Sequence, residues 1–198
     1  MTADSWDDFA ADWDNEPDVR KYADKAFESW QRKAAPLISS MAETRVLDFG
    51  CGTGLLTEKL APLCQHVVAV DTSVEMIGVL KRKIIEAGVK NVTPLVTSID
   101  SEAITEYRDT LGQFGLVVAS SVCSFLPDFE ATLCHIVTAM KPGGMFVQWD
   151  WLDDMPAEKI RDVFAKAGMI CISVEEEFDL AGKDGSMTVV MGIGKLDD

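Results

Sequence analysis

The sequence predicts a doubly wound α/β fold, in which a mainly parallel sheet lies between two layers of helices. Strand-like and helix-like segments alternate along the chain, which is the pattern of such a sheet. Five short apolar runs have the composition of buried parallel strands, and two further strand-like runs close the sequence. The 198 residues, of which 47% are hydrophobic, are enough for one core, and no linker divides them.

The predicted strands are runs rich in Val, Leu, Ile and Phe. In order, they cover residues 45–49, 66–70, 92–97, 115–120 and 145–149. After Gly168, residues 172–180 and 186–196 form two more runs joined by Ala-Gly-Lys-Asp-Gly, which predicts an antiparallel hairpin at the sheet edge. We therefore expect a mixed sheet of seven strands.

The helices between these strands have recognisable ends. The segment Thr72-Ser73-Val74-Glu75 has the form of a capping box, and Gly88 supplies a left-handed stop. The apolar residues expected on the inner face of this helix are Met76, Ile77, Leu80, Ile84 and Ile85.

Further helices are expected on the same grounds. One runs from about Asp128 to Met140, before a break at Lys141-Pro142-Gly143-Gly144, and another begins at Pro156 and stops at Gly168. A weaker pattern covers residues 101–111, and the first 40 residues are expected to hold one or two helices.

Composition excludes several partners and sites. The formal net charge of −15 repels nucleic acid and anionic membranes, and we interpret the acidic residues near both ends as solvated surface. No leader and no apolar stretch of about 18 residues is present, so we expect a cytoplasmic protein. Five cysteines without a C-x-x-C pair are typical of reduced thiols, and the two histidines support neither a metal site nor a catalytic triad.

A glycine-rich turn follows the first predicted strand in Asp48-Phe49-Gly50-Cys51-Gly52-Thr53-Gly54. Glycines permit a sharp turn and close approach to a ligand, and the following helix offers free N–H groups. Asp71 ends the second predicted strand, where a carboxylate can accept two hydrogen bonds from a ribose diol. The pattern therefore indicates a nucleoside cofactor.

The glycine spacing distinguishes two cofactor classes. The dinucleotide pattern G-x-G-x-x-G would require glycine where Leu55 stands. Asp48, just before the turn, would repel a pyrophosphate but suits a cofactor that carries an ammonium group. These features favour S-adenosylmethionine over NAD or NADP.

Further motifs follow the glycine turn in order along the chain. Together with the Asp48–Gly54 turn and Asp71, they are Ser98-Ile99-Asp100, Phe114-Gly115-Leu116-Val117-Val118, Leu126-Pro127-Asp128 and Lys141-Pro142-Gly143-Gly144. This ordered set resembles the class I S-adenosylmethionine-dependent methyltransferases that act on small molecules. The resemblance implies one methyltransferase domain over residues 1–198, with an N-terminal helical lid in residues 1–40 and a Rossmann-like core in residues 41–198. Many relatives have Asp where this chain has Gly115.

The resemblance also implies the cofactor-binding residues. They are Asp48, Gly50, Cys51, Gly52, Asp71, Thr72, Met76, Ile99, Asp100 and Ser120. Gly50 and Gly52 would contact the methionine part, Asp71 the ribose hydroxyls, and Asp100 the adenine amine. Three alternatives stay open: the glycines form only a tight turn, Asp100 caps a helix, or Met76 is ordinary core.

In this family the acceptor lies beyond the carboxyl ends of the fourth and fifth strands, under the lid. The residues expected there are Trp13, Cys123, Phe125, Trp149, Asp150 and Trp151. Two aromatic rings flanking a carboxylate would give an apolar wall and a proton acceptor. In the competing interpretation, the tryptophans only pack and Asp150 is solvated. Because a sulfonium is already activated, the catalytic residue stays unassigned.

The sequence thus predicts an enzyme that methylates a small molecule. No Asn-Pro-Pro-Tyr or Asp-Pro-Pro-Tyr segment follows the fourth strand, which disfavours planar nitrogens as acceptors. A catalytically silent S-adenosylmethionine-binding protein and an NAD(P)-dependent oxidoreductase are the alternatives. The acceptor, the methylated atom and the oligomeric state stay open.

Overall fold

A computed structural model of the protein describes residues 6–107, 109–182 and 185–198. The chain forms two compact units, Met1–Ser98 and Ile99–Asp198. The strands follow the sheet order β3-β2-β1-β4-β5-β7-β6, of which the first three belong to the first unit and the last four to the second. The predicted α/β fold with a seven-stranded mixed sheet is confirmed.

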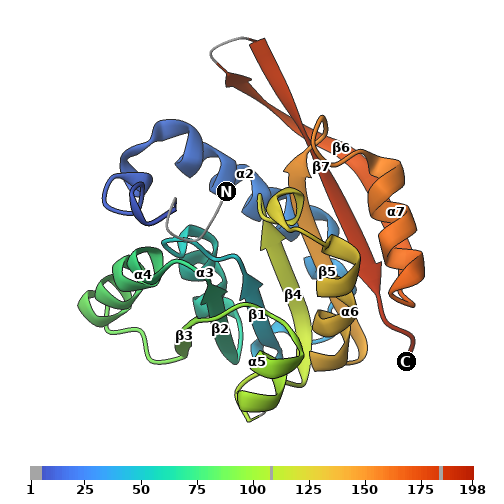
Figure 1. The fold of residues 1–198 in the computed structure, drawn as a ribbon, viewed down its shortest axis with the longest axis horizontal. Coiled ribbons are helices and arrows are strands. Elements are labelled where there is room, and N and C mark those ends of the chain that lie inside the picture. Colours follow the sequence, from blue (N-terminus) through green and yellow to red (C-terminus); the bar gives the residue numbers. More distant parts are fainter. Residues whose placement is uncertain (1–5, 108, 183–184) are drawn as a thin grey trace. The chain divides into compact units, whose positions relative to one another are not determined.

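The first unit holds three parallel strands and their helices (Figure 1). Its elements are η1 (Trp13–Asn15), α2 (Pro17–Lys33), η2 (Ala35–Leu37), η3 (Met41–Glu43), β1 (Arg45–Phe49), α3 (Leu55–Leu60), η4 (Ala61–Leu63), β2 (His66–Asp71), α4 (Val74–Glu86) and β3 (Val92–Val96). Adjacent residues of the inner strands, such as Val46 and Leu47, or Val67 and Val68, are completely buried. Burial on both faces explains why these strands are continuous apolar runs.

Helix α4 differs from the prediction at its start. Ser73, rather than Thr72, is the N-cap, and its Oγ accepts the Met76 N–H at 3.0 Å. The Ser73 N–H is itself bound by the Asp71 carboxylate, which leaves Thr72 in the turn before the helix. Gly88, with φ of 67°, follows the end of the helix as predicted.

The predicted inner face of α4 is wrong at one position. Met76, Ile77 and Leu80 are buried, whereas Ile85 is 77% exposed. Because each residue advances about 100° around a helix, Ile84 continues the buried stripe and Ile85 lies beyond it.

The second unit holds α5 (Ser101–Glu106), β4 (Phe114–Ser120), η5 (Cys123–Phe125), α6 (Phe129–Ala139), β5 (Met140–Trp151), α7 (Ala157–Lys166), β6 (Ile170–Gly182) and β7 (Gly185–Lys195). Strands β4 and β5 are parallel, and β7 is antiparallel to both β5 and β6. The predicted terminal hairpin is therefore confirmed, and in Figure 1 it extends past the ends of β4 and β5. Helix α5 is shorter than predicted and ends at Glu106.

Strand β5 is longer than predicted at both ends. The segment Lys141-Pro142-Gly143-Gly144, expected as a break before the strand, lies inside it at a shift in register against β4. Gly143 has φ of 68°, and a Cβ on Gly144 would lie 2.8 Å from the Lys141 carbonyl oxygen. The glycines thus create an irregularity within the strand rather than end it.

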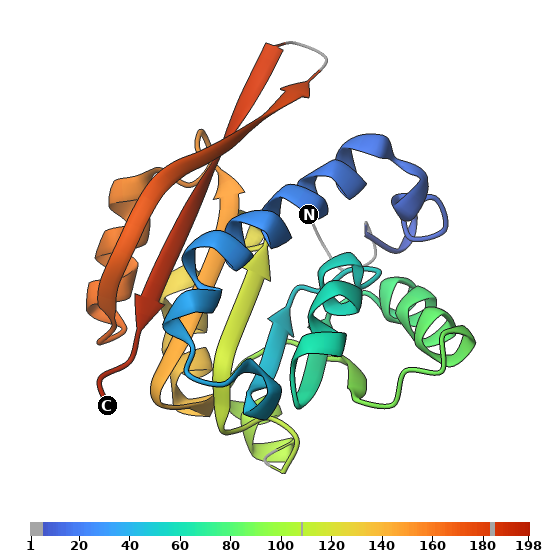
Figure 2. The same cartoon turned by 180° about the vertical axis from the view of Figure 1, so that it is seen from behind.

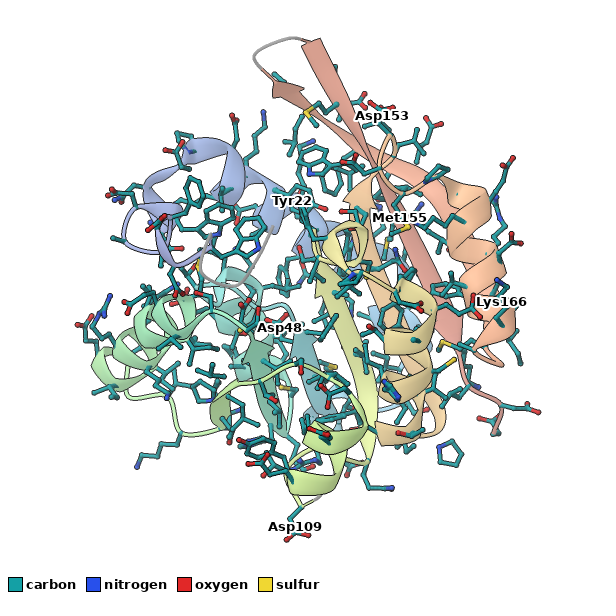
Figure 3. All side chains as sticks on the ribbon, viewed as in Figure 1. Tyr22, Asp48, Asp109, Asp153, Met155 and Lys166 are labelled. Carbon is teal, nitrogen blue, oxygen red and sulfur yellow. The ribbon has the colours of Figure 1, made fainter. Side chains whose placement is uncertain are left out.

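Helices α6 and α7 cover one face of β5. Phe146 on β5 packs against Phe129 of α6 and Phe164 of α7, with ring centroids 6.5 Å and 5.9 Å apart. Lys166, on the outside of α7 (Figure 3), pairs with Glu130 of α6 at 2.7 Å. Because side chains alternate along a strand, Gln148 and Asp150 lie on the same face of β5 as Phe146, whereas Trp149 and Trp151 lie on the opposite face.

Two further expectations concern sites and membranes. All five cysteines are free thiols, and no group of His, Cys, Asp or Glu side chains in the described part of the chain has the arrangement of a metal site. Within the same residues, no helix combines the length and the hydropathy that crossing a membrane requires.

Candidate functional site

The glycine-rich turn of the first unit is a backbone cradle at the carboxyl end of β1. Gly50, Gly52 and Gly54 have φ of 67°, 54° and 86°, which side-chain-bearing residues rarely adopt. A Cβ on Gly54 would lie 2.4 Å from Leu80 Cδ1, so this glycine also permits α4 to pack against the turn. The turn is linked to β2 by the Cys51 N–H, which donates to the Val70 carbonyl at 3.0 Å.

Asp71 joins this cradle to the start of α4. Its Oδ2 accepts the Gly52 N–H at 2.8 Å, and its Oδ1 accepts the Ser73 N–H at 2.9 Å. A carboxylate has about four acceptor sites, so capacity is left for ligand hydroxyls. Burial raises the pKa of Asp71 above its ordinary value, the N–H groups around it lower the pKa, and the nearby Asp7 carboxylate raises it further.

Asp48 lies on β1 inside the first unit (Figure 3) and is 1% exposed. The Thr57 hydroxyl of α3 donates to its Oδ2. Burial raises the Asp48 pKa to about 7, against the lowering effect of this hydrogen bond. Asp48 therefore links β1 to α3 through a buried hydrogen bond. The charge of its carboxyl group changes with pH near neutrality.

The N-terminal segment lies over the same turn, beside α3 and α4 (Figure 2). The Asp7 carboxylate accepts the Ser73 hydroxyl and, at 3.2 Å, the Glu75 N–H at the start of α4. The Asp14 carboxylate accepts the Thr53 hydroxyl of the turn and pairs with Lys83 of α4 at 2.9 Å. The interpretation of the N-terminal acids as solvated surface is thus wrong for Asp7 and Asp14.

Trp13 belongs to this N-terminal segment, residues 6–16, which we call the N-terminal cover. Its indole Nε1 lies 3.8 Å from the position of a Cβ on Gly52, and its ring packs edge-on against Trp6 at 5.8 Å between centroids. The structure thus places Trp13, predicted for the acceptor pocket, against the glycine turn.

The other predicted cofactor residues occupy several environments. In the first unit Cys51 is half-buried, Thr72 is exposed, and Met76 is 2% exposed, as the core alternative expects. In the second unit Ile99 is buried and Ser120 is half-buried at the end of β4. Asp100 caps α5, since its Oδ1 accepts the N–H groups of Glu102 and Ala103 at 3.0 and 2.9 Å.

The residues predicted for the acceptor pocket in the second unit do not form one aromatic wall around a carboxylate. We expected the chain to open into a loop after Trp149, but β5 continues to Trp151 and alternation places Asp150 on the other face. The alternative of a solvated Asp150 is also wrong, because Asp150 is completely buried. Phe125 is 36% exposed, and Trp151 is half-buried.

Neither cysteine of the candidate site has the properties of a nucleophile. Burial and the neighbouring carboxylates raise the pKa of Cys51 and of Cys123 well above the ordinary thiol value. Both therefore remain protonated at neutral pH.

Sequence reasoning missed several residues that shape the turn. They are Asp7, Asp14, Thr57 and Lys83, each distant in sequence from the glycine motif except Thr57. The cluster of acidic residues before α2 was only a weak indication of contacts with the turn, because acidic clusters are also common on solvated surfaces.

The chain is similar to methyltransferases in sequence. The family described as "Methyltransferase domain" matches residues 47–146, half of the chain. The Ubiquinone biosynthesis O-methyltransferase of Xanthomonas euvesicatoria pv. vesicatoria is 35% identical over 104 residues. This match covers 52% of the chain and 41% of the relative, so the chain matches about two fifths of the length of that protein.

Solved structures share the fold. A SAM-dependent methyltransferase from Aquifex aeolicus has a TM-score of 0.71 at 16% identity, with 99% of each chain covered. The N-methyltransferase NodS from Bradyrhizobium japonicum, solved with S-adenosyl-L-homocysteine, has a TM-score of 0.65 at 19% identity. That comparison covers 93% of this chain and 90% of NodS.

Proposed function

Because the chain belongs to the methyltransferase domain family, we propose that it transfers the methyl group of S-adenosylmethionine to a hydroxyl group of a small molecule. The predicted family resemblance, the enzyme class and the S-adenosylmethionine cofactor are confirmed at the level of the family. The family match disfavours the alternative of an NAD(P)-dependent oxidoreductase. The acceptor and the residue roles below are proposals.

The observation that carries the proposal is the Gly52–Asp71 hydrogen bond across the glycine turn. It holds one carboxylate oxygen beside a turn whose glycines let a ligand approach the backbone closely. We propose that Gly50 and Gly52 contact the amino-acid part of the cofactor and that Asp71 accepts hydrogen bonds from its ribose hydroxyls. The donor set fits this cofactor, since Asp71 offers a carboxylate to ligand hydroxyls and the nearby cation, Lys83, is already paired with Asp14 and Glu58.

The remaining cofactor residues are proposed from their places in the fold. Thr72 follows Asp71 directly, and Cys51 lies within the turn. From the second unit we propose Asp100 for the adenine ring and Ser120 for the amino-acid part, with the buried Ile99 as apolar support beside Asp100. Asp48 and Met76 are buried, so we propose that they support the turn and α4 rather than contact the cofactor.

The bound cofactor supplies an electrophilic methyl group on a sulfonium. Held by the glycine turn and Asp71, it would present this methyl group to an acceptor oxygen, and the acceptor proton would pass to solvent water. The chain's own part is to position the acceptor in line and to exclude water. We propose that Phe125 and Trp151 line the acceptor side and that the buried Cys123 and Trp149 support it from the core of the second unit.

A hydroxyl acceptor is favoured over a planar nitrogen on two grounds. The curated relatives are named as O-methyltransferases, and no Asn-Pro-Pro-Tyr or Asp-Pro-Pro-Tyr segment follows β4.

The charge of −15 favours a neutral or cationic small molecule over nucleic acid or an anionic surface. The free thiols favour the cytosol as the compartment.

Calorimetry and product analysis test this function. We expect S-adenosylmethionine and its demethylated product to bind with micromolar affinity or better, and NAD and NADP not to bind. A panel of phenols, catechols, carboxylic acids and amines is then scored by release of S-adenosylhomocysteine. Turnover with the hydroxyl compounds supports the proposal, whereas turnover only with amines contradicts it. Cofactor binding without turnover would favour the silent binding protein.

A further inference from the structure

Asp150 is a buried carboxylate inside the second unit. It lies near the end of β5 and is completely buried, as is Gln148 two residues before it. Within the described part of the chain no cation pairs with Asp150, so its contacts are hydrogen bonds from uncharged groups. A buried carboxylate of this kind is costly when ionised, which indicates that it has a role beyond packing.

The contacts of Asp150 attach a loop to the sheet. Its Oδ1 accepts the backbone N–H of Ser124 at 3.1 Å, and the Cys123 thiol donates to the same carboxylate. Both donors belong to η5, which follows β4. Two residues before η5, Ser121 has φ of 54°, and its N–H donates to the Trp149 carbonyl at 2.7 Å. The loop from Ser121 to Phe125 is therefore fixed to β5 through Asp150 and the backbone of Trp149.

Gln148 completes the cluster and leaves one atom unsatisfied. Its Nε2 donates to Asp150 Oδ2 at 3.0 Å, while its buried Oε1 has no hydrogen-bond partner in the part of the chain that the structure describes. A protonated Asp150 would offer a hydroxyl to that oxygen once the amide turns by 180°. The pair therefore has two arrangements that differ by one proton.

We propose that Asp150 is a positioning residue for methyl transfer, which fixes the Ser121–Phe125 loop for the acceptor in a manner that depends on its protonation. This inference rests on the proposed function, because Cys123 and Phe125 in the loop are proposed acceptor residues. The ionised form binds the Ser124 N–H and the Gln148 amide, whereas the protonated form binds the loop more weakly, since charge-assisted hydrogen bonds are the stronger ones.

The surroundings of the cluster support this dependence. Burial raises the Asp150 pKa to about 7, against hydrogen bonds from Ser124, Cys123 and Gln148 that lower it. The titratable neighbour from η5 is the Cys123 thiol, and Lys159 from α7 acts on that thiol. On β7 the residue opposite Asp150 is Val190, which has no charge. Hence Asp150 is the group of this cluster that titrates near neutrality.

The variant Asp150→Asn tests the proposal, because it has the shape of the protonated form and cannot ionise. In the wild type we expect the acceptor KM to fall about tenfold as pH rises through neutrality. In Asp150→Asn the acceptor KM should stay at the high value at every pH, with cofactor Kd within about twofold of wild type. The matched control is Asp179→Asn, which changes an exposed carboxylate that accepts the Thr188 hydroxyl at 2.8 Å and should keep the wild-type profile.

A second measurement needs no activity. In NMR spectra of the free wild-type protein, the Gln148 side-chain amide and the Ser124 N–H should shift together with one midpoint near neutrality. Both should be insensitive to pH in Asp150→Asn. Signals of Gln148 and Ser124 that do not titrate in the wild type, or an Asp150→Asn enzyme with the wild-type pH profile, would overturn the inference. If the wild type turns over no acceptor, the proposed function fails, and the NMR titration still decides the role of Asp150.

Discussion

The backbone N–H of Gly52 donates to Asp71 Oδ2 at 2.8 Å, which ties the glycine turn after β1 to the end of β2. The same carboxylate binds the Ser73 N–H, so one side chain organises the turn and the start of α4. The turn after β1, the end of β2 and the start of α4 therefore meet at one acidic group. This arrangement is the basis of the cofactor assignment and of the first prediction.

Replacing Asp71 should weaken cofactor binding while the fold persists. Asp71→Ala removes the acceptor for the Gly52 N–H and for the proposed ribose hydroxyls. Charge-assisted hydrogen bonds contribute roughly 1.5–3 kcal/mol, so we expect at least about a tenfold rise in Kd for S-adenosylmethionine by calorimetry. The control is Asp24→Ala, which removes a carboxylate that is 57% exposed and pairs with Lys59. Equal affinity of Asp71→Ala and wild type would place the ribose elsewhere.

The glycine turn should tolerate no side chain at Gly54. Its φ is 86°, and an added Cβ would lie 2.4 Å from Leu80 Cδ1. Gly54→Ala therefore combines backbone strain with a clash, and we expect a loss of about 2–4 kcal/mol in unfolding free energy. Gly88→Ala is matched in φ, at 67°, but has open space around the Cβ, so it should cost about 1 kcal/mol. Similar denaturation midpoints for the two variants would contradict the proposed close packing.

The N-terminal cover should loosen when Asp14 is removed. Asp14→Ala breaks the contacts to Thr53 and Lys83, and we expect faster hydrogen exchange in residues 6–16 with a loss of about 1 kcal/mol or less in unfolding free energy. Asp8→Ala, which removes an exposed acid of the same segment, is the control and should leave exchange unchanged. Unaltered exchange in Asp14→Ala would mean that the cover is held by its aromatic residues alone.

Stability should fall as pH rises because Asp48 is buried. Its pKa is raised from 3.8 to about 7, so between these values the folded state binds a proton that the unfolded state has lost. The Asp48 contribution is therefore fully present below about pH 4, and it is lost as pH rises towards 7. Between about pH 5 and about pH 8, the unfolding free energy should therefore fall by about 3 kcal/mol less in Asp48→Asn than in the wild type. The variant keeps an acceptor for the Thr57 hydroxyl. Parallel denaturation curves for variant and wild type at both pH values would contradict this.

The sequence was informative where one local rule determines the structure. The bounds of β1 follow from its apolar run. Gly88 and Gly168 end their helices because the chain adopts positive φ at both positions, which glycine does without steric cost. The predictions failed where tertiary contacts decide. Strand β5 runs through Gly143 and Gly144 because pairing with β4 resumes around the irregularity.

The candidate site shows the same division. The spacing of Gly50, Gly52 and Asp71 identified the first-unit cradle, since a βαβ unit brings these positions together. Asp7 binds Ser73, which lies 66 residues away in the sequence, and Asp14 binds Lys83, which lies 69 residues away. No local sequence pattern encodes such contacts. The burial of Asp150 could not be predicted from the sequence either. It depends on the extension of β5 to Trp151 and on the contact of Asp150 with η5.

The most direct test of the central claim uses S-adenosylmethionine with a deuterated methyl group. The protein is incubated with this cofactor and with the best hydroxyl acceptor of the panel, and the product is analysed by mass spectrometry. We predict a product in which one deuterated methyl group has replaced the hydroxyl proton, formed in step with S-adenosylhomocysteine. Label that stays on the cofactor with every acceptor, while calorimetry shows that the cofactor binds, would contradict the assignment as a methyltransferase.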